Sequence, residues 1–458
     1  MYSRNIYIYI LIVGLFTIGC EKLSNDPGSS GEDLKSDKGL NYWGGSYNDF
    51  GHAVVQTADG GYGVVGSQYS SDDQEDLILV KFSSSLKFES NTIYGGGIDS
   101  TYSNIANDLQ QTSDGGYITV GSTFNGTDYD VWVIKFASDL TTAWEDTIGT
   151  AGSDDFGSSI QQLNSGAYVV CGTSYDATNG DYDIMVWTVS YNATTDAKTD
   201  TTIFADTGSG TTNTTNDFGS HAHQTEDGGF IVVGTQGSNI ALIKLLADGS
   251  ADADRCSDGA AGSSTEALCC TENGGTFANS TCTDGTETWI TGFSGDGFLQ
   301  VDTGNNDEGT FVQELSDGSY IVVGNTEAGT GQQSNIYINT VSSIGVVGTT
   351  AITMGGAYDD KVECVRQTSD GGFVFTGGKY DDATGYDVWV VKLTPTLTTH
   401  WDYTFGGDLN DHGTSINQTD DGGYIITGST MSYGNQSEII LLKLNNTGEI
   451  DDLIGQLK

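Results

Sequence analysis

Apolar and polar residues follow one another along most of this chain in blocks, and the blocks return in a fixed order. One apolar block ends at glycine, as in Tyr117–Gly121, and a second follows it, as in Asp130–Lys135. Both are almost continuously apolar, a pattern typical of strands buried on both faces. More polar segments flank them, one carrying Gln and one ending in Gly-Gly, as at Gly406-Gly407. We therefore expect four strands per repeat, called A, B, C and D.

A short turn phrase, Asp-Gly-Gly followed by an aromatic residue, separates strands A and B. It begins at Asp59, Asp114, Asp227, Asp370 and Asp421, with variants at Ser165 and Asp317. Successive starts are 51 to 62 residues apart, except for one interval of 90. Asp followed by Gly favours a tight hairpin turn. Seven copies of the phrase indicate seven repeats.

The repeat predicts an all-β fold, a seven-bladed β-propeller of four-stranded antiparallel blades. A sheet whose inner strands are buried on both faces has to pack between two similar sheets, and radial repetition provides this. The last repeat ends with strand C at Glu438–Leu444, whereas Asn41–Gly45 resembles a strand D without its partners. Pairing of the N-terminal strand with the C-terminal blade would close the ring and remove its open edges.

The phrases Gly-Gly-x-x-x-Asp and Asp-Gly-Gly-Tyr-x-x-x-Gly resemble those of the bacterial seven-bladed β-propeller repeat (SBBP-type) proteins. The resemblance covers roughly residues 41–450. It implies the propeller architecture and says little about activity.

The N-terminus reads as an export signal. Residues 1–19 have a short basic start at Arg4 and an apolar run that is too short to span a membrane. The segment Thr17-Ile18-Gly19-Cys20 resembles the lipobox of bacterial lipoproteins, in which the Cys receives a lipid. The alternative is an ordinary signal peptide with an incidental Cys. Residues 20–40 are polar and without periodicity, and we expect a flexible linker there.

The expected division of the chain is therefore a signal peptide at 1–19, a lipid-anchored linker at 20–40 and a propeller at 41–458. The propeller carries a Cys-rich insertion at 251–290 between strands C and D of the fourth repeat. We expect an exported monomer that is lipid-anchored to the cell envelope, on the periplasmic or surface side of the outer membrane. Its contact with the membrane would be through the N-terminal lipid only.

Charge and cysteine content narrow the choice of partners. The net charge of −46 disfavours nucleic acid, because phosphates would be repelled. Cations and neutral ligands such as glycans fit better. In an exported protein the four clustered cysteines predict two disulfides, with the connectivity open: Cys256, Cys269, Cys270 and Cys282. Cys171 and Cys364 lie in strands of separate repeats and are expected to stay free and buried.

Acidic residues recur at the D–A junction, ten residues before the turn phrase. These D–A aspartates are Asp49, Asp155, Asp217, Asp307, Asp360 and Asp411, with Asn104 in the second repeat. In a propeller the D–A and B–C loops share one face, so these residues would circle the mouth of the channel. There they could bind Ca²⁺, and no other cofactor is expected. The competing interpretation is that each side chain fixes a turn through bonds to the backbone.

Aromatic residues gather in the B–C loops, where the repeats differ most from one another. The candidates for ligand binding are Tyr69, Phe124, Tyr129, Tyr175, Tyr182, Tyr380 and Tyr386. Rings beside carboxylates offer what a sugar needs, an apolar face and hydrogen-bond acceptors. The alternative is that these rings only cover the edges of the blades.

The resulting hypothesis is a binding module for a glycan, a protein or a ligand held with the help of a cation. The sequence has no phrase of a metalloprotease, a catalytic triad, a phosphate loop or a sialidase, and no catalytic residue is proposed. The alternatives are an extracellular glycan-degrading enzyme, which needs two apposed carboxylates in a pocket, and a structural component of a surface layer.

Overall fold

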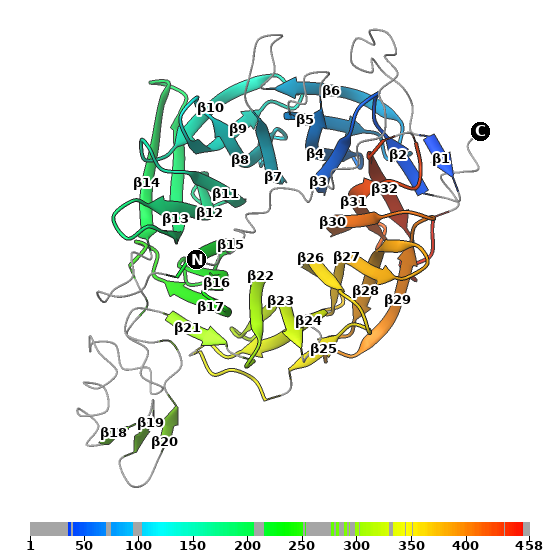
Figure 1. The fold of residues 1–458 in the computed structure, drawn as a ribbon. Coiled ribbons are helices and arrows are strands. Elements are labelled where there is room, and N and C mark those ends of the chain that lie inside the picture. The colour runs from blue at the N-terminus through cyan, green and yellow to red at the C-terminus, as the bar shows by residue number, and fades with distance from the viewer. Residues whose placement is uncertain are drawn as a thin grey trace.

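The computed structural model describes residues 35–451, apart from gaps at 38–39, 70–74, 95–102, 206–214, most of 251–297, 302, 329–332, 344, 350 and 435. Seven sheets surround a central channel, as the sequence predicts (Figure 1). The described residues form strands, turns and bends only, and none of them belongs to a helix that could cross a bilayer.

Each blade runs from the channel outward in the order A, B, C, D. The A strands are β3 (Asp49–Gln56), β7 (Asn104–Gln111), β11 (Asp155–Gln162), β15 (Asp217–Gln224), β22 (Asn306–Glu314), β26 (Lys361–Gln367) and β30 (Asp411–Gln418). The B strands are β4 (Tyr62–Tyr69), β8 (Tyr117–Phe124), β12 (Tyr168–Asp176), β16 (Phe230–Gln236), β23 (Tyr320–Ala328), β27 (Phe373–Asp381) and β31 (Tyr424–Thr430).

The C strands are β5 (Glu75–Phe82), β9 (Tyr129–Phe136), β13 (Asp181–Asn192), β17 (Asn239–Leu245), β24 (Gln333–Val341), β28 (Gly385–Leu393) and β32 (Glu438–Leu444). The D strands are β6 (Phe88–Tyr94), β10 (Thr142–Ile148), β14 (Ala197–Ala205), β21 (Phe298–Val301), β25 (Ile352–Met354), β29 (Thr399–Phe405) and β2 (Leu40–Trp43). All pairings are antiparallel.

The core lies between blades rather than inside them. Val64 and Ile78 of the first blade pack with Ile425 and Leu441 of the last, and all four are 1% exposed or less. Every residue of β32 is buried. This confirms that the continuous apolar pattern of strands B and C reflects burial on both faces.

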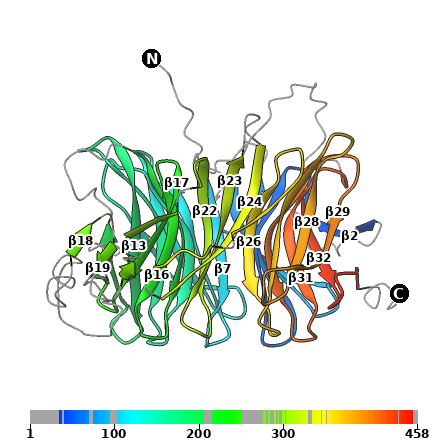
Figure 2. The same ribbon diagram turned by 90° about the horizontal axis from the view of Figure 1, so that it is seen from below.

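The ring closes with a strand from each end of the chain. Strand β2 pairs with β32 through Asn41 and Leu441, Tyr42 and Ile440, and Trp43 and Ile439. The predicted closure is therefore confirmed, and the two strands lie side by side in Figure 2. A further strand, β1 (Lys35–Asp37), pairs with β2 and gives this blade a fifth strand.

The Asp of the turn phrase has a second role that the sequence analysis did not assign. Asp370 accepts hydrogen bonds from the backbone N–H of Gly372 and the hydroxyl of Thr368, and it forms an ion pair with Lys392 of strand C. Gly371, which lies between Asp370 and Gly372, has a φ of 80°, a backbone conformation that favours glycine. Four other blades repeat the ion pair, as Lys81–Asp59, Lys135–Asp114, Lys244–Asp227 and Lys443–Asp421.

The Gln before the turn phrase joins neighbouring blades. The Oε1 atom of Gln111 accepts the backbone N–H of Ala58 in the preceding blade at 2.8 Å. Gln162 and Gln418 do the same for Ser113 and Ser369. The bond from Asp420 N–H to Gln56, also 2.8 Å long, repeats this link across the closure.

The insertion between β17 and β21 contains a separate three-stranded sheet of β18 (Thr276–Ala278), β19 (Thr281–Thr283) and β20 (Thr288–Ile290). Most of the insertion, with the side chains of its four cysteines, lies outside the described residues, as do Cys20 and the expected signal peptide. Cys171 and Cys364 are free and buried, as predicted.

Candidate functional site

A row of aromatic rings crosses three blades where strands A begin and strands B end. The centroids of Phe124 and Tyr129 are 5.0 Å apart, those of Tyr129 and Phe156 5.5 Å. The row continues through Tyr182 to Phe218, and Tyr175 lies 5.2 Å from Tyr182. This row, called the first aromatic cluster, belongs to the face formed by the D–A and B–C loops.

A second aromatic cluster lies on the same face over the fifth to seventh blades. Tyr380 stands 5.1 Å from Tyr386 and 5.5 Å from Tyr358, and Tyr386 meets the ring of His412 at 5.7 Å. Tyr358 is 38% exposed, and its hydroxyl donates a hydrogen bond to Asp382. Tyr69 is separate from both clusters; it packs edge-on to Phe50 and bonds to Glu75.

Polar side chains of the next blade hold the backbone that carries three of these rings. The N–H groups of Tyr129, Tyr182 and Tyr386 donate to the side chains of Asp154, Asn216 and Asn410, at 3.0 to 3.2 Å. Each acceptor directly precedes a D–A aspartate in the sequence. The polar residue before the D–A aspartate therefore holds the start of strand C in the preceding blade at these three junctions.

Sequence reasoning missed several members of the clusters. Phe156, Phe218 and His412 each follow a D–A aspartate directly, and Tyr358 precedes one by two residues. The signal was present, because every repeat aligns at that aspartate.

Three exposed apolar side chains extend this face between the sixth and first blades. Leu409 and Tyr47 stand in D–A loops and are 54% and 42% exposed, and Met431 of the adjoining B–C loop is 52% exposed. Ser432 bonds to the backbone N–H of Leu409, so the loops that carry Leu409 and Met431 are in contact. Leu409 and Met431 thus expose apolar side chains on two loops that are in contact.

The D–A aspartates lie at the starts of the A strands with their side chains buried, and Ca²⁺ binding there stays a prediction. All six are 3% exposed or less. Asp49, Asp155 and Asp411 each accept a backbone N–H of their own loop, from Gly45, Thr150 and Gly407, at 2.6 to 2.8 Å. Their side chains point into the blade junctions and fix the D–A turns. Among the described residues no three His, Cys, Asp or Glu side chains converge as a metal site would require.

Four of the five histidines lie on A strands, the innermost strands of the ring in Figure 1. His412 lies 3.1 Å from Glu363, and His52 is 2.7 Å from the hydroxyl of Ser67. Burial lowers the pKa of His52 to about 4, and it lowers the pKa of His221 and His223 as well, with the nearby Arg366 contributing. These three imidazoles are therefore neutral near pH 7, so none is poised as a proton donor.

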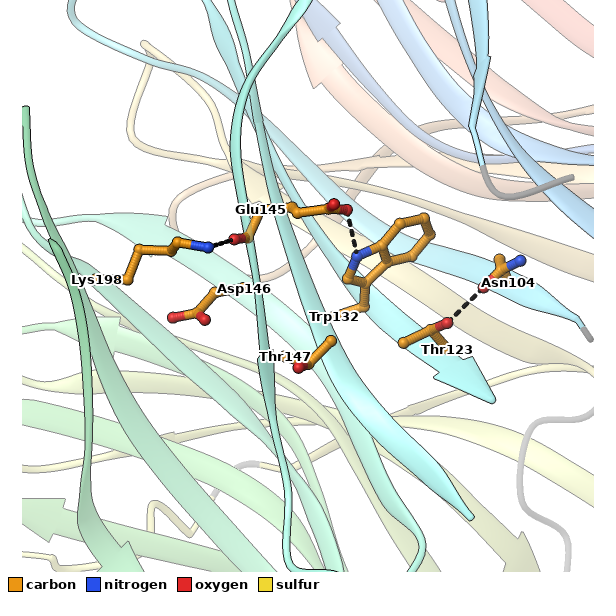
Figure 3. Close-up of a pocket in the computed structure, with 7 residues that line it drawn as sticks. All are labelled: Asn104, Thr123, Trp132, Glu145, Asp146, Thr147 and Lys198. Carbon is orange, nitrogen blue, oxygen red and sulfur yellow. Dashed lines mark hydrogen bonds between the residues drawn. The ribbon is translucent and has the colours of Figure 1, made fainter. Parts of the chain in front are cut away.

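One further depression, of about 410 Å³, lies against strands β9, β10 and β14 (Figure 3). Its polar groups largely bond to one another: Trp132 donates to Glu145 at 3.2 Å, and Lys198 bonds to the backbone carbonyl of Glu145. Trp132 is only 5% exposed. The depression thus offers a ligand little free ring surface.

No family model and no curated protein matches this chain. Among solved structures, it is similar to an ancestral GH74 enzyme, with a TM-score of 0.49, 11% identity and coverage of 93% of this chain and 52% of the other. For a periplasmic gluconolactonase from Pseudomonas aeruginosa the TM-score is 0.47 and the identity 9%, and the match covers 88% of this chain and 94% of the other. For an acylaminoacyl peptidase from Pyrococcus horikoshii the TM-score is 0.42 and the identity 10%, and the match covers 90% of this chain and 54% of the other. This chain thus spans about half the length of the first and third. Similarities this distant carry no information about its activity.

Proposed function

We propose that this protein is a cell-envelope lipoprotein of the seven-bladed repeat type that binds a glycan on its D–A/B–C face. The observation that carries the proposal is the second aromatic cluster. It combines an exposed ring, Tyr358, with a carboxylate at its hydroxyl, Asp382, and with Tyr380 behind it. A sugar ring stacks on such a surface through its apolar face and donates its hydroxyls to the acceptors beside it.

The geometry supports binding better than hydrolysis. A glycosidase needs two carboxylates that reach the substrate from an open pocket. Asp49 and Asp411 are 0% exposed, so neither carboxylate can touch a polymer on the surface. The exposed carboxylates near Tyr358 are loop residues such as Asp382, which suit the holding of hydroxyls.

The experiment is a glycan array with and without Ca²⁺, followed by titration of any glycan that binds. Removing a ring that makes a binding contact costs about 2 kcal/mol, roughly thirtyfold in affinity. We expect that loss for Tyr358→Ala and Tyr380→Ala, and Tyr175→Ala tests the first aromatic cluster in the same way. The matched control is Tyr403→Ala, because Tyr403 is 42% exposed on the outer strand β29. Equal binding by all four variants would disprove the site.

A protein partner is the second candidate, and the exposed Leu409 and Met431 favour it. It predicts that Leu409→Ser abolishes capture of a partner while leaving glycan binding unchanged. The proposed lipid anchor at Cys20 would place this face at a distance from the membrane set by the linker at 20–40.

A further inference from the structure

Four blade junctions bring together two acidic or amide side chains at one glycine of the D–A loop. In the last two junctions a Cβ on Gly406 would lie 2.0 Å from Asp387 Oδ1 and 2.7 Å from Asp411 Oδ2. A Cβ on Gly44 would lie 1.9 Å from Glu438 Oε2 and 2.5 Å from Asp49 Oδ2. At Gly149 the same position is shared by Asp130 and Asp155, at 2.1 and 2.9 Å. One residue begins strand C and the other begins strand A of the next blade.

The strand register extends this arrangement to all seven junctions. The pairs are Asp76 with Asn104, Asp130 with Asp155, Asp183 with Asp217, Asn239 with Asp307, Asn335 with Asp360, Asp387 with Asp411, and Glu438 with Asp49. Four junctions therefore have two carboxylates, three have one carboxylate and one amide, and none has two amides. Where the D–A position is Asn104, the carboxylate of the pair is that of Asp76 on strand C.

The pair Asp387–Asp411 shows what a carboxylate–carboxylate junction lacks. Asp387 Oδ1 is buried and has no hydrogen-bond partner, although it is directed at the same glycine as Asp411 Oδ2. Asp411 is 0% exposed, and its Oδ2 already accepts bonds from Gly407 and Ser432. Two ionised carboxylates can only accept hydrogen bonds. The missing element is one donor between them.

At the junction of Asn335 and Asp360 a neutral amide takes the place of one carboxylate, and its Nδ2 donates to the carbonyl of Gln333 at 3.5 Å. Asn335 Oδ1 and Asp360 Oδ2 lie 2.0 and 3.2 Å from a Cβ on Gly355. We propose that each junction with two carboxylates holds one shared proton, which supplies the donor that two ionised carboxylates lack. The O–H···O bond then joins strand C of one blade to strand A of the next.

Two observations favour a proton over a metal ion as the occupant. Each of these pairs has at most two acidic side chains, and no group of three is found among the described residues, whereas Ca²⁺ takes six to eight oxygen ligands. Burial also raises the pKa of Asp49 to about 7 and that of Asp155 to about 6, and burial raises the pKa of Asp387.

The charged groups around Asp387 and Asp411 do not replace the proton. Asp381, at the end of β27, adds a like charge. Lys379 of β27 is directed to Asp402 of β29 at 3.8 Å, and His412 of β30 to Glu363 of β26 at 3.1 Å. Among the described residues, no cation is within ion-pair distance of either carboxylate.

The sign of the pH dependence follows from the raised pKa of the folded state. Such a carboxyl contributes stability fully below its unfolded pKa of 3.8, and the contribution is lost as the pH rises to about 7 in the case of Asp49. We therefore expect the thermal midpoint of the full chain to fall between about pH 5 and about pH 8.

The test compares Asp387→Asn and Asn335→Asp with wild type at both pH values. Asp387→Asn installs the amide permanently, so its midpoint should exceed that of wild type by a few degrees at the higher pH and by less at the lower pH. Asn335→Asp creates a fifth carboxylate pair and should be destabilised at the higher pH only. Asp408→Asn is the charge-matched control, because Asp408 is exposed in the same D–A loop as Asp411, and it should show neither effect.

Infrared difference spectra give an independent reading, since a protonated carboxyl has a C=O band that a carboxylate lacks. Wild type should show that band near neutral pH, and Asp387→Asn should lose part of it. The proposal fails if Asp387→Asn lowers the midpoint equally at both pH values, or if the band is absent. It also fails if millimolar Ca²⁺ raises the wild-type midpoint and Asp387→Asn removes that rise, because the junction would then be a cation site.

Discussion

The ion pair between Lys392 and Asp370 allows a quantitative test of how the turn phrase stabilises a blade. Lys392 is 3% exposed and donates to Asp370 and to the carbonyl of Leu393, at 2.9 to 3.1 Å. Asp370→Asn leaves a buried ammonium without its anion, which costs 3–5 kcal/mol in a fully buried pair. Because the Asp370 side chain is 57% exposed, water replaces part of the interaction, and we expect a loss of about 2 kcal/mol.

The opposite substitution should cost less. Lys392→Met fills the same volume and leaves Asp370 at the surface, where water solvates it, so we expect a loss of about 1 kcal/mol or less. Urea unfolding followed by tryptophan fluorescence measures both variants and the double variant. Asp317→Asn is the control, since Asp317 bonds Ser319 within the same kind of turn but faces Thr340 rather than Lys on strand C. It should change stability by about 0.5 kcal/mol at most.

The pH dependence of this pair runs opposite to that of the junction pairs. The pKa of Asp370 is lowered to about 2 by bonds from Thr368, Lys392 and Gly372, which outweigh burial. Its contribution is present above the unfolded pKa of 3.8 and is lost as the pH falls to about 2. After allowance for exposure it is about 1 kcal/mol. The reasoning is refuted if Lys392→Met destabilises more than Asp370→Asn, or if their difference from wild type is unchanged at about pH 2.

Three further outcomes are expected. Gln56→Ala should remove the bond that crosses the ring closure and cost about 1 kcal/mol in urea unfolding, with Gln111→Ala, which removes the same bond between two internal blades, giving a similar loss. Cys20→Ala should abolish lipid labelling and release the protein into the soluble fraction; continued membrane fractionation would contradict the lipobox. Mass mapping should find two disulfides among Cys256, Cys269, Cys270 and Cys282, and four free thiols there would disprove them.

The fold could be predicted from the sequence because its signal is repeated. Each Asp-Gly-Gly phrase alone is weak evidence for a turn, but seven of them together give the strand order and the number of blades. They also show that the segment with Gly44-Gly45 is a strand D without an A–C partner set before it. The regular spacing and the continuity of the apolar blocks then favour a ring over isolated sheets, because strands that are apolar on both faces must pack between two similar sheets. The confirmed pairing of the N-terminal segment with Glu438–Leu444 followed from counting strands, without any knowledge of side-chain contacts.

The site was predicted less well, because a loop position does not reveal where its side chain points. Asp49 and Tyr380 both belong to the D–A/B–C face, yet Asp49 is directed inward to its own turn and the junction. Alternation along strand A explains the difference: Asp49 is buried and Phe50 is partly exposed. The sequence holds this alternation, but the bulge after Gly51 shifts it later in the strand. Contacts between blades, such as Tyr129 with Phe156, also depend on neighbours about 30 residues apart.

The closure of the ring sets the order in which this protein can fold. Val54 bonds to Ser415, and Asp420 bonds to Gln56, across 361 and 364 residues of chain. Strand β2 pairs with β32, so this pairing can form only after nearly the whole polypeptide has been synthesised. Contacts this distant in sequence slow folding, and an open sheet edge exposed in the meantime invites pairing with another chain. We therefore expect chains that end before Leu444 to aggregate more readily than the full chain.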